Sequence, residues 1–430
     1  MGILSDKRWL ILALLCLKIG FLAHGAKATV QGTARNRLPQ SSRNPPPSII
    51  KNDPTHGDSS YNFELLHTTE RYENDGTERK EVSARIRILN WSGAQQWPEL
   101  SFQHNPSREH VEIRSVQVVR KDDEIVKVHT ADSPIFGPRR SHGPDFDETR
   151  VLLPSLAPGD AIHYTVDTTS TIPLARGHFW QAYSFQASIT DEELEVSIPD
   201  YRKPRLKTKP WVQTSVRELN GQRFFTFRLL TALATTHNQE DNGASSRLSP
   251  DILMSTFESW EDVGRWYGQL EKSRRTPSPL VRAKADELTK SLSTDFEKVE
   301  ALYKFTSTEV VNFSPAAFGL GGYEPRTAEE VLETRYGDCK DKDVLLAALL
   351  EAEGWHTSSA LISTFREFDR DVPSPWPFTH VVTVLSLRGK QVWMDSSTPL
   401  VQFRTLPHVL HKKRALVLSP DATPHFEDTP

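Results

Sequence analysis

The sequence predicts two domains, an N-terminal all-β antiparallel sandwich followed by an α+β domain. Two observations support this fold class. From about residue 60 to 230, short apolar runs repeat with period two between turn signals. After about residue 255, the apolar period becomes helical, and strand-like runs return after Gly354. With 430 residues, the chain is long enough for two or three domains at about 150 residues each.

The first 28 residues have the pattern of a secretory signal peptide. Two basic residues precede the apolar run "WLILALLCL", and the small-residue site "AKA" ends at Ala28. A retained anchor is an alternative, but the run is short for a membrane span and Lys18 interrupts it. A buried N-terminal helix fits less well because a polar tract follows. We therefore expect export to the periplasm or the exterior, with no transmembrane span in the mature chain.

Cysteine and charge counts narrow the class of protein. Cys16 lies in the leader, and Leu15 before it is not the small residue expected before a lipidated cysteine. Removing the leader takes four of 52 basic residues and one of 56 acidic residues, which leaves a net charge of −7. This charge argues against a nucleic-acid partner. Cys339 remains as a lone thiol, so no disulfide framework can form.

The two domains have a tether before them and a linker between them. Residues 29–58 are rich in Ser, Asn, Arg and Pro and predict a flexible tether. The β-sandwich is expected over 59–230, and the polar stretch 231–255 is expected to be a linker. Strands are expected at 83–89, 110–119, 161–169, 192–199 and 223–230.

The second domain is expected over 256–430. Its helices begin with an amphipathic stretch near 260–270, and capping boxes mark helix starts at Thr294 and Thr327. The last helix, in "GDCKDKDVLLAALLEAEG", is closed by Gly354. Three antiparallel strands are then expected at 359–364, 378–387 and 391–397.

Cys339 is expected in the first turn of that helix, because Gly337 and Asp338 form a turn and an N-cap. Unpaired N–H groups and the helix dipole at this end favour a thiolate, which is the nucleophile of acyl transfer. The same N–H groups could hold a developing oxyanion. A small buried cysteine is the alternative. It fits poorly because "KDKD" follows and the apolar face begins only at Val344.

A cysteine nucleophile needs a base and a group that orients the base. His380 opens one strand and Asp395 lies in the next. If the hairpin loop is Arg388–Gly389, these two residues are diagonal neighbours on one face, about 7–8 Å apart at Cβ. A four-residue loop keeps this register, and a loop of odd length does not. Taken singly, each residue is more readily a strand-end polar group; together with Cys339 they predict a catalytic triad.

This order of elements is similar to the transglutaminase-like superfamily, which has a papain-like fold. The strings "GLGGYEPRTAEEVLETRYGDCKDKDVLLAALLEAEGW", "PSPWPFTHVVTVL" and "VWMDSST" resemble exported bacterial proteins in which a β domain of unknown function precedes a transglutaminase-like domain. The stretch "GHFWQAYSFQASITDEELEVSIP" agrees more loosely with that β domain. The resemblance covers roughly residues 60–417. The chain departs from it in ending at Pro430, where many relatives continue, and in having Phe313 where a tyrosine is expected.

The resemblance implies Cys339 as nucleophile, His380 as general base and acid, and Asp395 as the orienting group. It implies acyl transfer or hydrolysis at an amide, with a glutamine or peptide carbonyl as donor, water or an amine as acceptor, and no cofactor. Some animal relatives use calcium, but nothing here resembles a calcium loop. It leaves the substrate and the choice between hydrolysis and cross-linking open.

Weaker signals concern the surroundings of the triad. Tyr323 is a candidate wall of the cleft, and Trp376 and Phe378 form either an apolar subsite for the acyl donor or a pin that fixes their loop to the core. The acidic stretch 139–150 has irregular spacing, so a solvated loop is favoured over a metal site. No metal-binding or cofactor-binding residue is therefore proposed.

Two functions are open at this point. One is an exported cysteine acyltransferase or peptidase; the other is a binding or scaffold protein that keeps the fold without turnover. All three triad residues are present, which favours the enzyme. For the β domain, an adhesive, sugar-binding, regulatory or purely structural role is equally open.

Overall fold

The computed structural model describes residues 60–129, 147–186, 188–230, 249–312, 322–399, 401–419 and 423–430. All of them belong to one compact unit, Ser41–Pro430. The expected leader, 1–28, and the expected tether, 29–58, lie outside the described residues, as does Phe313. Within the part of the chain that is described, no helix is long and apolar enough to cross a membrane.

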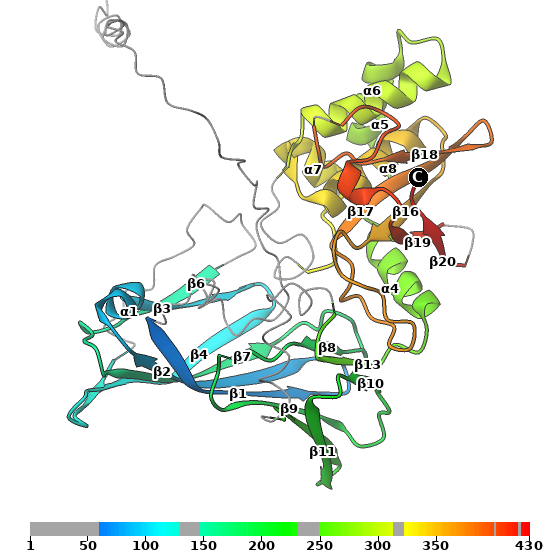
Figure 1. Cartoon of the computed structure of the whole chain (residues 1–430). Coiled ribbons are helices and arrows are strands. Elements are labelled where there is room, and N and C mark those ends of the chain that lie inside the picture. Colours follow the sequence, from blue (N-terminus) through cyan, green and yellow to red (C-terminus); the bar gives the residue numbers. More distant parts are fainter. Residues whose placement is uncertain are drawn as a thin grey trace, which may run out of the picture. The chain divides into compact units, whose positions relative to one another are not determined.

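An eight-stranded sheet dominates the N-terminal region (Figure 1). Its strands, in spatial order, are β11 (Val212–Leu219), β12 (Gln222–Leu229), β9 (Glu192–Pro199), β1 (Tyr61–Tyr72), β2 (Glu78–Ile88), β7 (Ala161–Ser170), β4 (Glu109–Val119) and β5 (Ile125–Lys127). The short helix α1 (Trp91–Gln96) follows β2. Two smaller sheets accompany this one, β3 (Glu99–His104) with β6 (Asp147–Leu152), and β10 (Arg205–Thr208), β13 (Ile252–Ser255) and β8 (Trp180–Tyr183).

Both small sheets share apolar cores with the large one. Leu100 and Phe102 of β3 are buried with Ile86 and Val118 of the large sheet, because alternate residues of each strand face inward. β8 and β13 likewise share a core with β9 and β12. The pairs are antiparallel except that β1 runs parallel to β9. The predicted division into a β-rich first domain and a mixed second domain is confirmed.

The expected linker 231–255 has one structured end. Residues 231–248 lie outside the described residues, but Ile252–Ser255 forms β13, the central strand of its sheet. All four residues are buried and pair with β8 and β10. A run of four residues within a polar stretch is too short to show a hydrophobic period. The sequence therefore did not reveal this strand.

The C-terminal region begins with helices, as predicted. They are α4 (Trp260–Lys272), α5 (Pro279–Thr289), α6 (Asp295–Thr308), α7 (Ala328–Thr334) and α8 (Cys339–Ala352), together with the short strands β14 (Val311–Asn312) and β15 (Tyr336–Gly337). Both predicted capping boxes are formed, at Thr294 and at Thr327. Gly354 follows α8 with φ of +90°, a conformation that suits glycine.

A five-stranded antiparallel sheet completes this region. Its order is β18 (Lys390–Met394), β17 (His380–Leu387), β16 (Thr357–Ile362), β19 (Arg414–Leu418) and β20 (His425–Asp428), and the 3-10 helix η2 (His408–Leu410) precedes β19. Helix α8 packs against β16 and β17 on one side and against α5, α6 and α7 on the other. It is therefore the central helix of the domain, and its residues from Cys339 to Leu350 are all buried.

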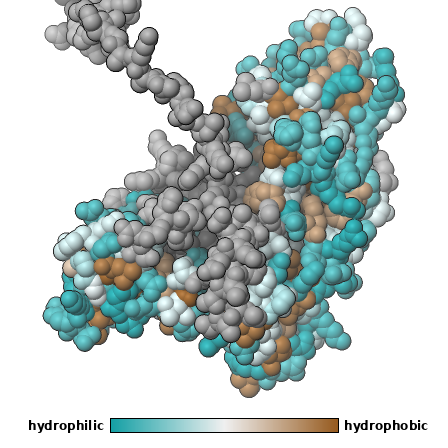
Figure 2. Space-filling view, viewed as in Figure 1, coloured by the Kyte–Doolittle hydropathy of each residue, from teal (hydrophilic) through white to brown (hydrophobic). Residues whose placement is uncertain are grey.

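On the face shown in Figure 2, hydrophilic residues predominate and hydrophobic ones form small separate patches. Among the described residues, the most exposed large apolar side chains include Trp91, Val311 and Tyr201. These lie in separate segments of the chain, and single exposed apolar residues of this kind are ordinary in folded proteins.

Candidate active site

Cys339 is the first residue of α8, as the sequence predicts, because Asp338 caps the helix. The Asp338 carboxylate accepts the N–H groups of Lys340 and Asp341 at 3.1 and 3.2 Å. The Asp341 carboxylate in turn accepts the N–H of Asp338 at 3.3 Å, which completes a capping box. The N–H of Lys342 binds the Asp338 carbonyl.

This capping corrects one expectation. Asp338 already accepts hydrogen bonds from three N–H groups of the first turn. These three groups are therefore not free to bind an oxyanion. The described part of the chain shows no acceptor for the Cys339 N–H, which leaves this group as the helix donor closest to the thiol.

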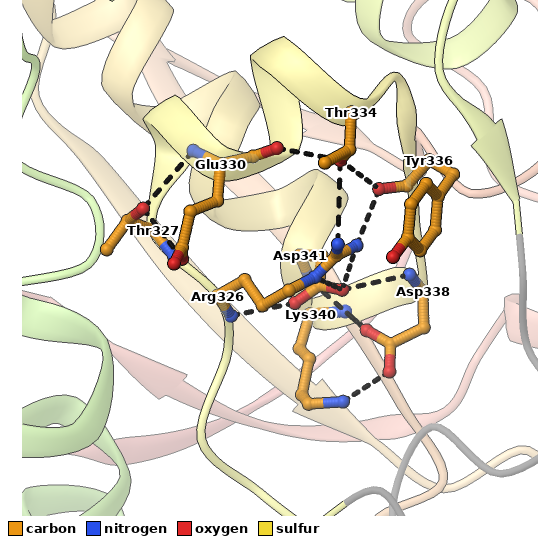
Figure 3. A network of polar contacts seen from close by, with 8 residues as sticks. All are labelled: Arg326, Thr327, Glu330, Thr334, Tyr336, Asp338, Lys340 and Asp341. Atoms are coloured by element: carbon orange, nitrogen blue, oxygen red, sulfur yellow. Dashed lines mark hydrogen bonds and ion pairs between the residues drawn. The ribbon is translucent and has the colours of Figure 1, made fainter. Parts of the chain in front are cut away.

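Arg326 holds the turn before Cys339 in place (Figure 3). Its backbone N–H and its guanidinium bind the Asp341 carboxylate at 2.9 to 3.2 Å, and its Nη2 donates to the Tyr336 carbonyl at 2.6 Å. Gly337 is required here, because a Cβ at this position would lie 2.7 Å from Cβ of Asp341. The start of α8 is thus fixed by contacts on both sides of the cysteine.

The thiol is more enclosed than its polar neighbours suggest. Cys339 is only 4% exposed and packs with Leu361, Val381 and Tyr323. The run "KDKD" after it, which argues from sequence against a buried cysteine, is itself buried. Lys340 forms a close ion pair with Asp338, and the Cys339 thiol adds to the effects that raise the lysine pKa despite its burial.

The β17–β18 hairpin has the predicted register. Leu387 pairs with Lys390 across the two-residue loop Arg388–Gly389, and both loop residues have positive φ. The ladder ends at Thr383 and Met394, so Asp395 comes one residue beyond it, diagonal to His380.

The predicted side chains meet at this end of the sheet. Nε2 of His380 lies 3.2 Å from Oδ1 of Asp395, as an ion pair when the imidazole is protonated. Both the charge of Asp395 and its capacity to accept a hydrogen bond favour the protonated imidazole. The Cys339 side chain also acts on His380 and favours its protonated form.

These neighbours decide the protonation of the imidazole. Burial alone would lower the pKa of His380, but the Asp395 carboxylate and then the Cys339 side chain outweigh it and raise the pKa well above its usual value. For Asp395, burial acts to raise the pKa, and His380 and Ser397 more than offset it, so that the pKa is lowered. The site therefore favours a charged imidazolium–carboxylate pair.

Two more residues were not predicted from sequence. Lys342 is fully buried and donates from Nζ to the carbonyls of Ser307 and Val310 at 3.3 and 2.8 Å. Asp343, also buried, accepts hydrogen bonds from Ser359 and Thr383. The sequence contains one sign of these two residues, a run of charges at the start of a helix. That the whole run is buried becomes evident only from the central position of α8.

The three candidate substrate-binding residues lie in the same buried cluster as Cys339. Tyr323 contacts the rings of Trp180 and Trp266, and its hydroxyl donates to the Pro375 carbonyl at 3.3 Å. Phe378 packs on Trp260 and Phe368, and Trp376 lies under the Arg366 guanidinium. These contacts favour the role of pinning the loop to the core, and a contact with substrate stays a prediction.

The acidic stretch 139–150 is described only from Asp147 onward. His142 and Asp145 lie outside the described residues, whereas Asp147 and Glu148 begin β6, where Glu148 pairs with Arg150. A search limited to the described ranges finds no group of three or more His, Cys, Asp or Glu side chains that could hold a metal ion.

Family models match two segments of the chain. Residues 74–231 match a domain of unknown function, DUF3857, and residues 282–367 match the transglutaminase-like superfamily. The chain combines a DUF3857 domain with a transglutaminase-like domain. The second match contains Cys339 and ends before His380 and Asp395. The assignment of these two residues to the site therefore depends on the geometry of the hairpin.

Two solved structures match over most of this chain, and the first of them shares its fold. A candidate protease from Parabacteroides distasonis ATCC 8503 matches with a TM-score of 0.67 and 14% identity, over 87% of this chain and 72% of that one. At this identity the likeness shows the fold alone. A candidate cysteine protease from Cytophaga hutchinsonii matches over 86% of this chain and 88% of that one, at 10% identity and a TM-score of 0.24, which carries no argument. No curated protein matches by sequence.

Proposed function

We propose that this protein is an exported cysteine-dependent enzyme that breaks an amide bond and passes the acyl group to water or to an amine. The transglutaminase-like domain supplies the reaction class. One observation carries the proposal: the same imidazole, that of His380, interacts with the Cys339 thiol and with the Asp395 carboxylate. A protein that only binds has no need of this arrangement.

In the proposed reaction, the Cys339 thiolate attacks the carbonyl carbon of the amide and forms a tetrahedral intermediate. The backbone N–H of Cys339 is the helix donor placed to stabilise its oxyanion. The His380 imidazolium then gives its proton to the leaving amine, the C–N bond breaks, and a thioester remains. His380 next takes a proton from the acceptor, which attacks the thioester and releases the thiolate. Asp395 keeps the imidazole oriented and stabilises its positive charge in both steps.

Alkylation of the thiol tests the proposal without knowledge of the substrate. The full chain carrying Cys16→Ser has Cys339 as its single thiol and would be reacted with iodoacetamide from pH 4 to 9. We expect the rate to rise with a midpoint well below about pH 8.5, the ordinary value for cysteine. His380→Gln should return the midpoint toward that value. A midpoint of about 8.5 in both proteins would reject the enzyme and leave a binding protein.

Product analysis separates the two acceptors. The protein would be incubated with a peptide library, with and without a labelled primary amine, and the products identified by mass spectrometry. Cleaved peptides or deamidated glutamine indicate water as acceptor, whereas incorporation of the amine indicates transfer. Cys339→Ser, which keeps the helix cap and removes the thiolate, is the matched control and should give neither product.

Export is a separate part of the proposal and rests on the N-terminal sequence pattern. Expression in a Gram-negative host with fractionation should place the protein in the periplasm or medium. The mass of the exported protein should equal that of the chain without residues 1–28. Replacing two leucines of the apolar run by arginine should retain the full-length chain in the cytoplasm. A mature chain of full mass would contradict cleavage.

A further inference from the structure

A single carboxylate bridges two paired strands beneath the candidate active site. Ser359 of β16 lies directly opposite Thr383 of β17. The Ser359 hydroxyl donates to Oδ2 of Asp343 at 2.7 Å, and the Thr383 hydroxyl donates to Oδ1. All three residues are buried. Because Asp343 belongs to α8, it ties the helix to both strands at one point.

This bridge connects the segments that carry the nucleophile and the base. Asp343 lies one helical turn after Cys339, so both project from the same side of α8. Thr383 is on the same strand as His380. The charge of His380 also acts on Asp343. Burial keeps the pKa of Asp343 above its usual value, and the two hydroxyl donors, Arg275 and His380 limit that rise. A shift of Asp343 would therefore move helix and strand relative to each other.

Groups from α4 and the turn after it face the same carboxylate. Arg275 donates from Nη2 to the Thr357 carbonyl at 3.0 Å and from Nη1 to Glu271 at 3.3 Å. Tyr267 of α4 is also charge-coupled to Glu271, Asp343 and Cys339, and its pKa is raised well above the usual value, chiefly by burial, so that it stays neutral.

The proton of this buried cluster belongs on Glu271 rather than on Asp343. Asp343 accepts two hydroxyl hydrogen bonds, which stabilise an ionised carboxylate. Oε2 of Glu271 is buried and receives no hydrogen bond in the described part of the chain, so the charged form of Glu271 is less well stabilised than that of Asp343. Burial first, and the charge of Asp343 in addition, raise the pKa of Glu271 to about 7, although Arg275 opposes this.

We infer that Asp343 is a second carboxylate of the catalytic centre, a positioning residue that clamps α8 to β17 and whose negative charge supports the imidazolium of His380. This inference rests on the proposed function. Asp395 acts on His380 directly, through the ion pair at 3.2 Å. Asp343 acts from the helix that carries the nucleophile, so it stabilises the Cys339–His380 ion pair and its geometry together.

The test compares Asp343→Asn with Glu271→Gln, both in the Cys16→Ser chain. The first change removes a negative charge and keeps the size of the side chain. The second removes a carboxyl group that is largely protonated below about pH 6, because its pKa is about 7, and that does not bind the reacting residues. Alkylation of Cys339 would be followed from pH 4 to 9, and far-UV circular dichroism would check the fold.

We expect Asp343→Asn to move the alkylation midpoint upward by about 0.5–1 pH unit, and to lower the rate near pH 6 by about 3–10-fold. Glu271→Gln should leave the midpoint within about 0.2 unit. If Asp343→Asn does not fold, Thr383→Val takes its place: it deletes one donor to the carboxylate and should shift the midpoint in the same direction by a smaller amount.

A profile of Asp343→Asn that superimposes on the parent, or a shift in Glu271→Gln as large as that in Asp343→Asn, would overturn the inference. These outcomes differ from failure of the proposed function. In that case the parent itself would have an ordinary midpoint that His380→Gln does not change.

Discussion

The Tyr303 hydroxyl, on α6, donates to the backbone carbonyl of Asp395 at 3.0 Å, and to the carbonyl of Val401 at the same distance. Tyr303 is buried, and burial raises its pKa well above its usual value, with the Asp395 charge adding to the effect. The hydroxyl is therefore a permanent donor. Through this contact, α6 fixes the chain that carries the Asp395 carboxylate immediately after β18 ends.

Replacing Tyr303 by phenylalanine should loosen Asp395 without changing the side chains of Cys339, His380 or Asp395. We expect the Tyr303→Phe variant to lose about 1–2 kcal/mol of unfolding free energy in urea, since the carbonyls of Asp395 and Val401 lose the hydroxyl hydrogen that they share. The alkylation rate of Cys339 near pH 6 should fall about 3–10-fold because His380 is held less well. The matched control is Tyr201→Phe, which removes only an exposed hydrogen bond to Asn74; it should cost less than about 0.5 kcal/mol and leave the alkylation rate unchanged. An unchanged alkylation rate in Tyr303→Phe would show that Asp395 does not depend on this contact.

Lys342 offers a prediction with a defined sign. Burial lowers its pKa to about 8, with the charge of Asp395 opposing the effect. An unfolded lysine keeps its proton up to about pH 10.5, so the unfolded state binds more protons between pH 8 and 10.5, and stability from this group rises with pH. Lys342→Met should cost about 1–3 kcal/mol at pH 7, where two carbonyls lose their donor.

The difference in unfolding free energy between the parent and Lys342→Met should then widen from pH 8 to 10. The matched control is Lys304→Met, at an exposed position on α6, which should stay within about 0.5 kcal/mol of the parent throughout. If the difference in unfolding free energy between the parent and Lys342→Met became smaller as the pH rises, Lys342 would not be the group that loses its proton on folding.

His380 should give the opposite slope. Its pKa is raised in the folded protein, so its contribution to stability is complete below about pH 6.5 and disappears as pH rises through the folded value. The difference in unfolding free energy between the parent and His380→Gln should thus be largest near pH 6 and decline toward pH 9–10. His356→Gln, at an exposed position, serves as the control and should show no such slope. A difference that is independent of pH would mean that the imidazolium is not stabilised by Asp395 and Cys339.

Local signals in the sequence predicted much of the candidate site. A two-residue loop, Arg388–Gly389, fixes the hairpin register by parity alone, so the relation of His380 to Asp395 could be worked out without a structure. The cap at Asp338 likewise follows from a short stretch of chain. Capping and hairpin register depend on neighbours in sequence, and these were predicted correctly.

Burial of charge could not be predicted in this way. The run from Lys340 to Asp343 is polar in the sequence, yet α8 is covered on all sides, and three of these four charges have partners on other segments of the chain. Lys342 reaches the end of α6, and Asp343 reaches a pair of strands. The sequence by itself determined which residues could do the chemistry and how the hairpin aligns two of them. Only the tertiary structure decided what surrounds them, because the partners of a buried charge come from segments that are distant along the chain.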